Sequence, residues 1–124
     1  MATRLTDLRR LNADRFLDHA RLLMVKFGHC KGLMRAPSGA LSCTAALYAG
    51  CGAKPDRIPW DAENAEVAGV PAKNCAVADE LLLFLEGLAR TDCLEEWNDR
   101  EGIEIGQCLG LLQKAADMIR ISLD

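Results

Sequence analysis

The chain has 124 residues, of which 50% are hydrophobic, 27% are charged and only 5% are aromatic. This length and composition are typical of one folded domain and exclude a disordered chain. Apolar runs are far shorter than the ~20 residues of a membrane-spanning helix, and no signal-peptide pattern follows Met1. We therefore expect a single helical domain over residues 1–124, located in the cytoplasm and not bound to a membrane.

The formal net charge of −3 is unevenly distributed along the chain. Residues 1–35 hold eight Lys/Arg against three Asp/Glu, whereas residues 36–124 hold seven against fifteen. This division can mark a basic binding face, or a basic first helix that packs beside acidic helices. Packing is favoured, because the chain as a whole is acidic and lacks a run of Lys and Arg. Aspartates also interrupt the basic segment. Nucleic-acid binding is the weakest alternative, and its residues would be Arg4, Arg9, Arg10, Arg15, Arg21 and Lys26.

Apolar residues predict a first helical segment over about residues 6–27. They recur every three or four positions apart from one irregularity near Asn12, where the helix could start afresh. Gly28 is expected to end the segment, because glycine readily adopts the left-handed conformation found after a helix.

The next stretch predicts a turn, a short helix and a loop. Pro37-Ser38-Gly39 indicates a turn, and its flanks could pair as a small β-hairpin near residues 31–41. Ser42 is the expected N-cap of a small-residue helix over 43–49. The three prolines of residues 53–73 predict a long irregular loop, with at most a turn of helix around residues 61–68.

Three more helices are expected towards the C-terminus. Leucines predict a helix over about residues 74–88, and its broad apolar face indicates a central position. The spacing of Asp92 and Glu95 favours a capped short helix. Regular apolar positions predict a final helix over 103–121. The predicted fold class is mainly α, as a compact bundle of four to five helices.

Six cysteines without a C-x-x-C pair are expected to be free thiols rather than disulfides. The one group that could bind zinc is His29-Cys30 with Cys43 and Cys51, but it lacks the spacing of a structural zinc site. No cysteine has the local signature of a catalytic nucleophile, and no glycine-rich phosphate-binding sequence occurs. We therefore predict no catalytic residue, no metal and no cofactor, which favours a protein that is not an enzyme.

Trp97-Asn98-Asp99 is the most distinctive local pattern. Trp97 is expected to bury a large apolar surface. Asn98 or Asp99 is expected to accept hydrogen bonds from the first N–H groups of the last helix, since Asn and Asp are common capping residues. The alternative is a small enzyme or ligand-binding domain, in which Asn98 and Asp99 share a pocket with His29 or Arg35.

Trp60 lies in the predicted loop over 53–73. It either folds back on the core or stands exposed as an anchor for a partner, since tryptophan is enriched at protein interfaces. The loop around it is acidic and could imitate the charge of a nucleic acid towards a basic partner.

The chain resembles a family of small uncharacterised bacterial and phage proteins that share a Trp-Asn-Asp signature before the C-terminal helix. The matching parts are residues 28–32, 43–47, 80–88, 97–99 and 111–116. The sequence departs from the family at His29, where an aromatic residue such as Trp is expected, and at Gly102-Ile103, which replaces an Arg-Thr-like step. The resemblance implies a mobile-element context and no established activity.

Together these patterns predict a non-enzymatic protein-interaction module, from a phage or plasmid, that modulates a host or defence complex. The expected partner is another protein, and the patterns do not indicate an oligomeric state. The candidate binding residues are Trp60, Trp97, Asn98, Asp99, His29 and Arg35.

Overall fold

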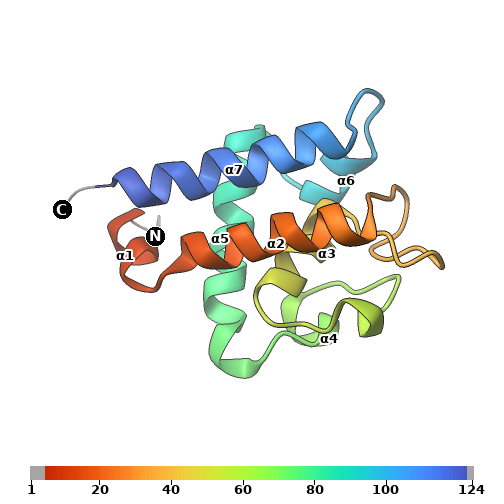
Figure 1. Ribbon diagram of the computed structural model, residues 1–124, viewed down its shortest axis with the longest axis horizontal. Helices are drawn as coiled ribbons and strands as arrows, with labels where there is room; N and C mark the ends of the chain where they lie inside the picture. The colour runs from red at the N-terminus through yellow and green to blue at the C-terminus, as the bar shows by residue number, and fades with distance from the viewer. Residues whose placement is uncertain (1–4, 123–124) are drawn as a thin grey trace.

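The computed structural model describes residues 5–122, which form helices and no strand. The predicted mainly α fold class is thereby confirmed (Figure 1). The elements are α1 (Leu5–Arg10), α2 (Ala13–Phe27), α3 (Cys43–Gly50), the 3-10 helix η1 (Pro55–Arg57), α4 (Ala65–Ala68), α5 (Ala72–Ala89), α6 (Leu94–Asp99) and α7 (Ile105–Ile121).

The first helical segment is broken at Asn12, as the irregular pattern predicted. Asn12 has a left-handed backbone with φ 56° and separates α1 from α2. Asparagine tolerates this conformation better than most residues, so the break has a local cause. Gly28, with φ 94°, ends α2 as expected.

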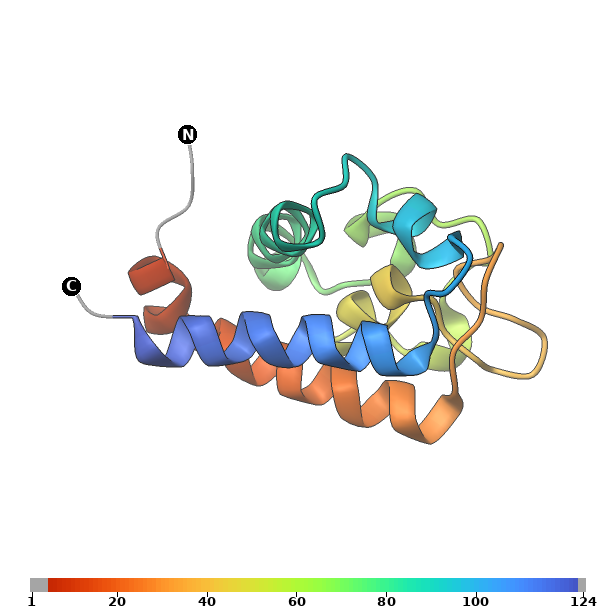
Figure 2. The same ribbon diagram turned by 90° about the horizontal axis from the view of Figure 1, so that it is seen from above.

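Helices α2 and α7 lie side by side and run in opposite directions (Figures 1 and 2). Small side chains on both helices face the interior, which allows the close approach. The fully buried positions are Ala13, Leu17, Ala20 and Met24 on α2, and Cys108, Leu112, Ala115, Ala116 and Ile119 on α7. At the exposed edge, Arg120 of α7 forms ion pairs with Asp14 and Asp18 of α2.

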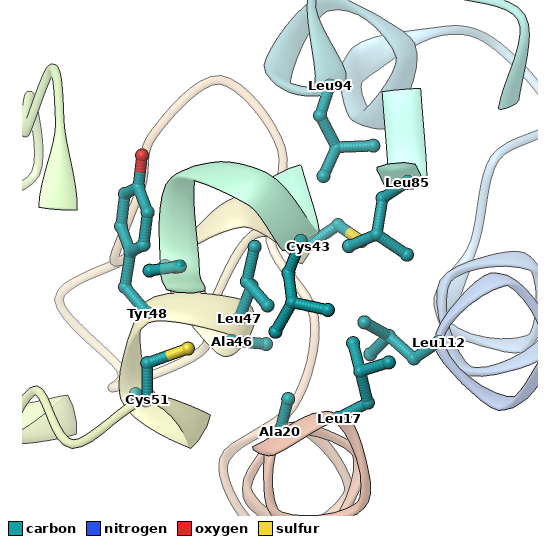
Figure 3. Packing of buried hydrophobic residues seen from close by; sticks show 14 of the residues in the cluster. Leu17, Ala20, Cys43, Ala46, Leu47, Tyr48, Cys51, Leu85, Leu94 and Leu112 are labelled. Atoms are coloured by element: carbon teal, nitrogen blue, oxygen red, sulfur yellow. The ribbon is translucent and has the colours of Figure 1, made fainter. Parts of the chain in front are cut away.

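The centre of the fold is α3, whose eight residues are all buried. Side chains from α2, α5, α6 and α7 converge on it, as Leu17, Leu85, Leu94 and Leu112 show in Figure 3. The prediction that the 74–88 helix is central is therefore wrong. Helix α5 buries three residues fully and leaves Leu83 63% exposed, so it covers one side of α3.

Gly50 sets the distance between α3 and α2. A Cβ at this position would lie 2.3 Å from the carbonyl oxygen of Phe16 and 2.8 Å from the Cβ of Ala20. Only glycine fits such a contact with a neighbouring backbone. The small residues of α3 therefore explain how one short helix can be surrounded on all sides.

Residues 28–42 form an irregular loop, so the predicted hairpin near 31–41 is wrong. Arg35 and Leu41 form a single antiparallel bridge, and His29 and Leu41 a single parallel one. Hydrogen bonds close the predicted turn, with the Gly39 N–H donating to the Ala36 carbonyl at 2.8 Å. The pairing of Arg35 with Leu41 does not extend into a β-ladder, because the Met34 N–H donates to the carbonyl of Trp60, in another loop, at 2.9 Å.

The chain between α3 and α5 is mostly irregular, as predicted. It contains η1 and the single helical turn of α4, which Asn64 caps by accepting a hydrogen bond from the Val67 N–H at 2.9 Å. Within residues 5–122, none of the helices has both the length and the apolar character needed to cross a bilayer.

Candidate functional site

The side-chain amide of Asn98 lies at the junction of three segments. Asn98 is fully buried near the end of α6. Its Oδ1 accepts a hydrogen bond from the backbone N–H of Cys43, the first residue of α3, at 3.0 Å. Its Nδ2 donates to the carbonyl of Cys30 at 3.0 Å and to Asp99 at 3.1 Å. The amide thus joins α6 to α3 and to the loop that follows α2.

The predicted capping of the last helix by Asn98 or Asp99 is wrong. Both residues end α6, and residues 100–104 separate them from α7. Helix α7 is capped by Glu104 and Gln107, in a reciprocal capping box in which the Gln107 side chain accepts from the Glu104 N–H at 2.8 Å. Asn98 instead accepts a hydrogen bond from the first N–H of α3, an earlier helix whose N-cap is Ser42, as predicted.

The start of α6 also differs from expectation. Cys93 precedes the helix without a capping side chain, so the predicted Asp92–Glu95 capping box does not form. The first N–H of α6, from Leu94, donates to Glu86 Oε2 of α5 at 2.9 Å. A carboxylate from a neighbouring helix thus satisfies a donor that we expected a local residue to cap.

The orientation of Asn98 fixes the tautomer of His29. Two backbone partners set the amide so that its oxygen faces His29 Nε2 at 2.7 Å. Because an amide oxygen only accepts, Nε2 carries the proton. Cys108 Sγ lies 3.5 Å from the same nitrogen. An Nε2 that is already protonated cannot take the thiol proton, so this geometry does not activate Cys108 as a nucleophile.

Cys108 and Cys43 form a buried thiol pair beside this network. The hydrogen bond between them raises the pKa of the Cys43 thiol well above its ordinary value, and burial raises it further. The same hydrogen bond lowers the pKa of Cys108, which burial partly offsets. All six cysteines are free thiols, as predicted. In the part of the chain that the structure describes, no three His, Cys, Asp or Glu side chains form a metal-binding group.

The end of α6 also holds the loop that follows α2. Asp99 accepts a hydrogen bond from the Gly32 N–H at 2.8 Å. Lys31 donates to the carbonyl of Arg100 at 2.8 Å and lies 3.9 Å from Glu104. Trp97, which was expected to be the core anchor, is only partly buried. In the Trp-Asn-Asp sequence, Asn98 is therefore the fully buried residue.

Trp60 and Arg35 lie together on a different surface. They line a pocket of about 450 Å³ with Leu33, Ala36 and Pro37. The Trp60 side chain is 61% exposed. Arg35 donates from Nε to the carbonyl of Ile58 at 2.8 Å. The structure therefore places His29, Asn98 and Asp99 in one network, and Arg35 with Trp60 in an exposed pocket.

Comparison with protein families covers most of the chain. The family model DUF6197, described as a family of unknown function, matches residues 9–118. The chain belongs to DUF6197. No curated protein and no solved structure matches it. The matched range contains the Asn98 network and the Trp60 pocket of this DUF6197 chain.

Three basic residues of the N-terminal helices in this DUF6197 chain have acidic or polar partners. Arg10 lies 3.6 Å from Asp7, and Arg21 lies 3.5 Å from Asp18. Arg9 donates to the carbonyl of Ser122. Arg4, which the nucleic-acid alternative includes, lies outside the described residues. The two ion pairs lie within the N-terminal helices themselves, and the ion pairs between α2 and α7 have the opposite polarity, from Arg120 of α7 to Asp14 and Asp18 of α2, so they do not show a basic helix packed beside acidic ones.

A second pocket contains residues that the sequence patterns did not assign to a binding site. It has a volume of about 190 Å³ and lies among α3, α5, α6 and the loop before α4. Its polar lining includes Thr44, Glu86 and Glu95. One signal was present in the sequence. Glu95 and Asn98 are three residues apart, which places both side chains on the same face of a helix.

Proposed function

We propose that this DUF6197 protein is a non-enzymatic interaction module that binds another protein through the surface around Trp60. The observation that carries the proposal is a large aromatic side chain that is 61% exposed on a loop with a fixed backbone. The Trp60 carbonyl accepts a hydrogen bond from Met34, whose side chain is buried in the core.

Burial of an exposed tryptophan by a partner contributes a large favourable free energy to binding. Burying the exposed part of the indole is worth roughly 3 kcal/mol, from typical aromatic areas and transfer energies. A soluble protein leaves such a side chain in water at a cost, and tryptophan and arginine dominate the centres of protein interfaces. Trp60 and Arg35 supply both residue types in one pocket.

The Trp60 pocket is already ordered before a partner binds. Arg35 is held on the Ile58 carbonyl, and the neighbouring Pro37 restricts the loop backbone. A surface that loses little conformational freedom on binding retains more of its contact energy as affinity. The hydrogen bonds of Asn98 and Asp99 to residues 30 and 32 attach the same loop to the end of α6.

The charge around Trp60 indicates the chemistry of the partner. Four exposed acidic side chains occur before and after it in the sequence, at Asp56, Asp61, Glu63 and Glu66, against two exposed basic ones at Lys54 and Arg57. The fitting partner presents an apolar side chain to the pocket and basic residues around it. In the phage or plasmid context that the resemblance implies, this partner is a host protein, such as a component of a defence complex.

The test is quantitative capture from nuclease-treated host lysate with tagged wild type and three variants. Trp60→Ala and Arg35→Ala should each reduce recovery of a stoichiometric partner at least tenfold. Leu22→Ala is the matched control, because Leu22 is 69% exposed in the separate groove between α2 and α7. Loss of the partner with Leu22→Ala but not with Trp60→Ala would assign binding to that groove. Absence of any stoichiometric partner would refute the interaction module.

A further inference from the structure

The groove between α2 and α7 lies on an outer face of the molecule. In Figures 1 and 2 these two helices form one layer, and no other element of residues 5–122 covers its outer side. The groove has a volume of about 460 Å³, and its apolar lining comes from Leu22, Val25 and Leu109. Leu22 and Val25 are 69% and 64% exposed. Exposed apolar side chains gathered at one groove are typical of an interaction surface.

This face contains both a hollow and the side chains to fill one. Leu22 and Val25 are three residues apart on α2, so they form a ridge along the edge of the groove. An interface with two-fold symmetry pairs one surface patch with itself, so the patch must supply both the projection and the hollow. The ridge of one copy fits the groove of a second copy, and the reverse contact follows by symmetry.

The charges along α2 are also complementary to themselves. Asp18, Leu22 and Lys26 are spaced by four residues and therefore form one row along the helix. Asp18 and Leu22 line the groove, and Lys26 is exposed at the other end of the row. A two-fold axis at Leu22, perpendicular to α2, makes the rows of two copies antiparallel. Asp18 of each copy then faces Lys26 of the other, while the two Leu22 side chains meet at the axis.

Both charged ends of this row are accessible for such a contact. Lys26 forms no ion pair with the residues that the structure describes. The Asp18 side chain is 38% exposed, although it contacts Arg21 at 3.5 Å and also Arg120. Arg120 is shared with Asp14, at 3.0 Å. Two carboxylates thus divide the charge of one guanidinium, and Asp18 retains the capacity to accept a further donor.

We propose that two copies of this chain form a symmetric dimer through the groove between α2 and α7. Leu22 and Val25 of each copy enter the groove of the other, and Asp18 pairs with Lys26 at both ends of the contact. The row carries both signs of charge in antiparallel order, which favours a second copy over a partner of uniform charge. None of these residues lines the Trp60 pocket, so the dimer goes beyond the proposed function and does not rest on it.

Sedimentation equilibrium of the purified full chain measures the dimer directly. Wild type should associate reversibly as its concentration rises to about 1 mM, the weak end of the range for a small interface. Leu22→Ala should weaken this association at least tenfold. Leu83→Ala is the matched control and should leave it unchanged, because Leu83 is 63% exposed on α5, away from the groove. A wild type that stays monomeric, or an equal loss in the two variants, would overturn the proposal.

Exchange of the charges tests the antiparallel arrangement. Lys26→Glu and Asp18→Lys should each weaken self-association at least tenfold, because like charges then meet at both ends of the row. An equimolar mixture of the two variants should form a heterodimer with an affinity close to that of wild type, because both contacts again join opposite charges. Lys73→Glu, at an exposed position of α5, changes the net charge as Lys26→Glu does and should not affect association. Circular dichroism checks the folding of each variant. Failure of the mixture to associate, under conditions in which wild type does, would refute the pairing.

Discussion

The Asn98 side chain accepts a hydrogen bond from the backbone N–H of Cys43, the first residue of α3, at a separation of 55 residues in the chain. The local N-cap of α3 is Ser42, which accepts a hydrogen bond from the Ala45 N–H at 3.1 Å. Helix α6 thus supplies a second acceptor at the start of the same helix, and the same amide binds the Cys30 carbonyl. Three segments of the chain therefore depend on one buried side chain, and this dependence can be measured.

Removal of the Asn98 amide should strongly destabilise the protein. In Asn98→Ala, the Cys43 N–H and the Cys30 carbonyl lose their partner inside the fold, so we expect a loss of about 3 kcal/mol. Asn98→Asp should also destabilise, because a carboxylate cannot donate to Cys30 and adds a like charge beside Asp99. Urea unfolding measures both effects, with the exposed Glu96→Ala as control. A loss below about 1 kcal/mol in Asn98→Ala would contradict the structural role.

Two glycine-to-alanine substitutions should have opposite effects. A methyl group at Gly50 would overlap the backbone of α2, so Gly50→Ala should lower the free energy of unfolding by at least about 2 kcal/mol. Gly110 in α7 has open space around its Cβ position, so Gly110→Ala should raise it by about 0.5–1 kcal/mol. Thermal melting compares the pair. A neutral Gly50→Ala would show that α2 and α3 are farther apart than described.

The two tryptophans should differ in their contribution to stability. Trp97 packs partly buried against the core, so Trp97→Ala should cost about 2 kcal/mol. Trp60 is mostly exposed, so Trp60→Ala should cost less than about 1 kcal/mol. Chemical denaturation of the two variants tests this order. The reverse order would mean that Trp60 is a core residue, which would also remove the basis for its role as an anchor.

The pKa of Glu95 predicts a dependence of stability on pH. Its carboxyl has a higher pKa in the folded than in the unfolded chain, chiefly through burial, while the Ser42 and Thr44 hydroxyls lower it and Asp99 raises it. The folded state therefore holds this proton more tightly, and the stability it contributes is fully present below the unfolded pKa. That stability is lost as the pH rises through the folded pKa.

Glu95→Gln cannot titrate and should lack this loss. The free energy of unfolding of wild type should fall relative to that of Glu95→Gln as the pH rises from below 4.5, the ordinary value, to neutral. The neighbouring carboxyl groups Glu86 and Asp99 are present in both proteins, so their titration cancels to first order in the comparison. A difference that is independent of pH, or that grows in favour of wild type, would show that the pKa is not raised.

The thiols should differ in reactivity in the folded protein. Cys43, Cys51 and Cys108 are buried, and burial raises the pKa of Cys51 to about 12. Iodoacetamide should therefore modify the partly buried Cys75 and Cys93 first, and the three buried thiols only after unfolding. Mass spectrometry of timed samples gives the order. Early modification of Cys43 or Cys108 would mean that the centre of the fold opens readily.

Much of the helix content could be predicted because its causes are local. The periodic apolar residues of α2 and α7, the N-cap Ser42 and the irregular position Asn12 all act within a few residues of themselves. The sequence patterns did not identify α3 as the central helix, because its eight residues are mostly small and uncharged and have no polar face to mark its environment.

The candidate site was harder to predict because its contacts join distant segments. Asn98 is of a residue type that commonly caps the helix next to it. Its actual partner, the Cys43 N–H, follows only from the adjacency of α6 and α3 in the fold. The structure separates Arg35 from the other residues of the predicted pocket, His29, Asn98 and Asp99, for the same reason. Residues 29–32 are bound by α6, whereas Arg35 is bound by the backbone at Ile58. The sequence assigned Glu95 to a local capping box with Asp92, which does not form, and gave Thr44 no role.

The hydrogen bond from the Cys43 N–H to Asn98 also has a consequence for synthesis on the ribosome. Residues 43–50 and their local N-cap Ser42 emerge early, but the acceptor for the first N–H is made 55 residues later, and α7, which covers α2, comes later still. The contacts that bury this central helix on all sides can therefore form only after residues 94–121 have been translated.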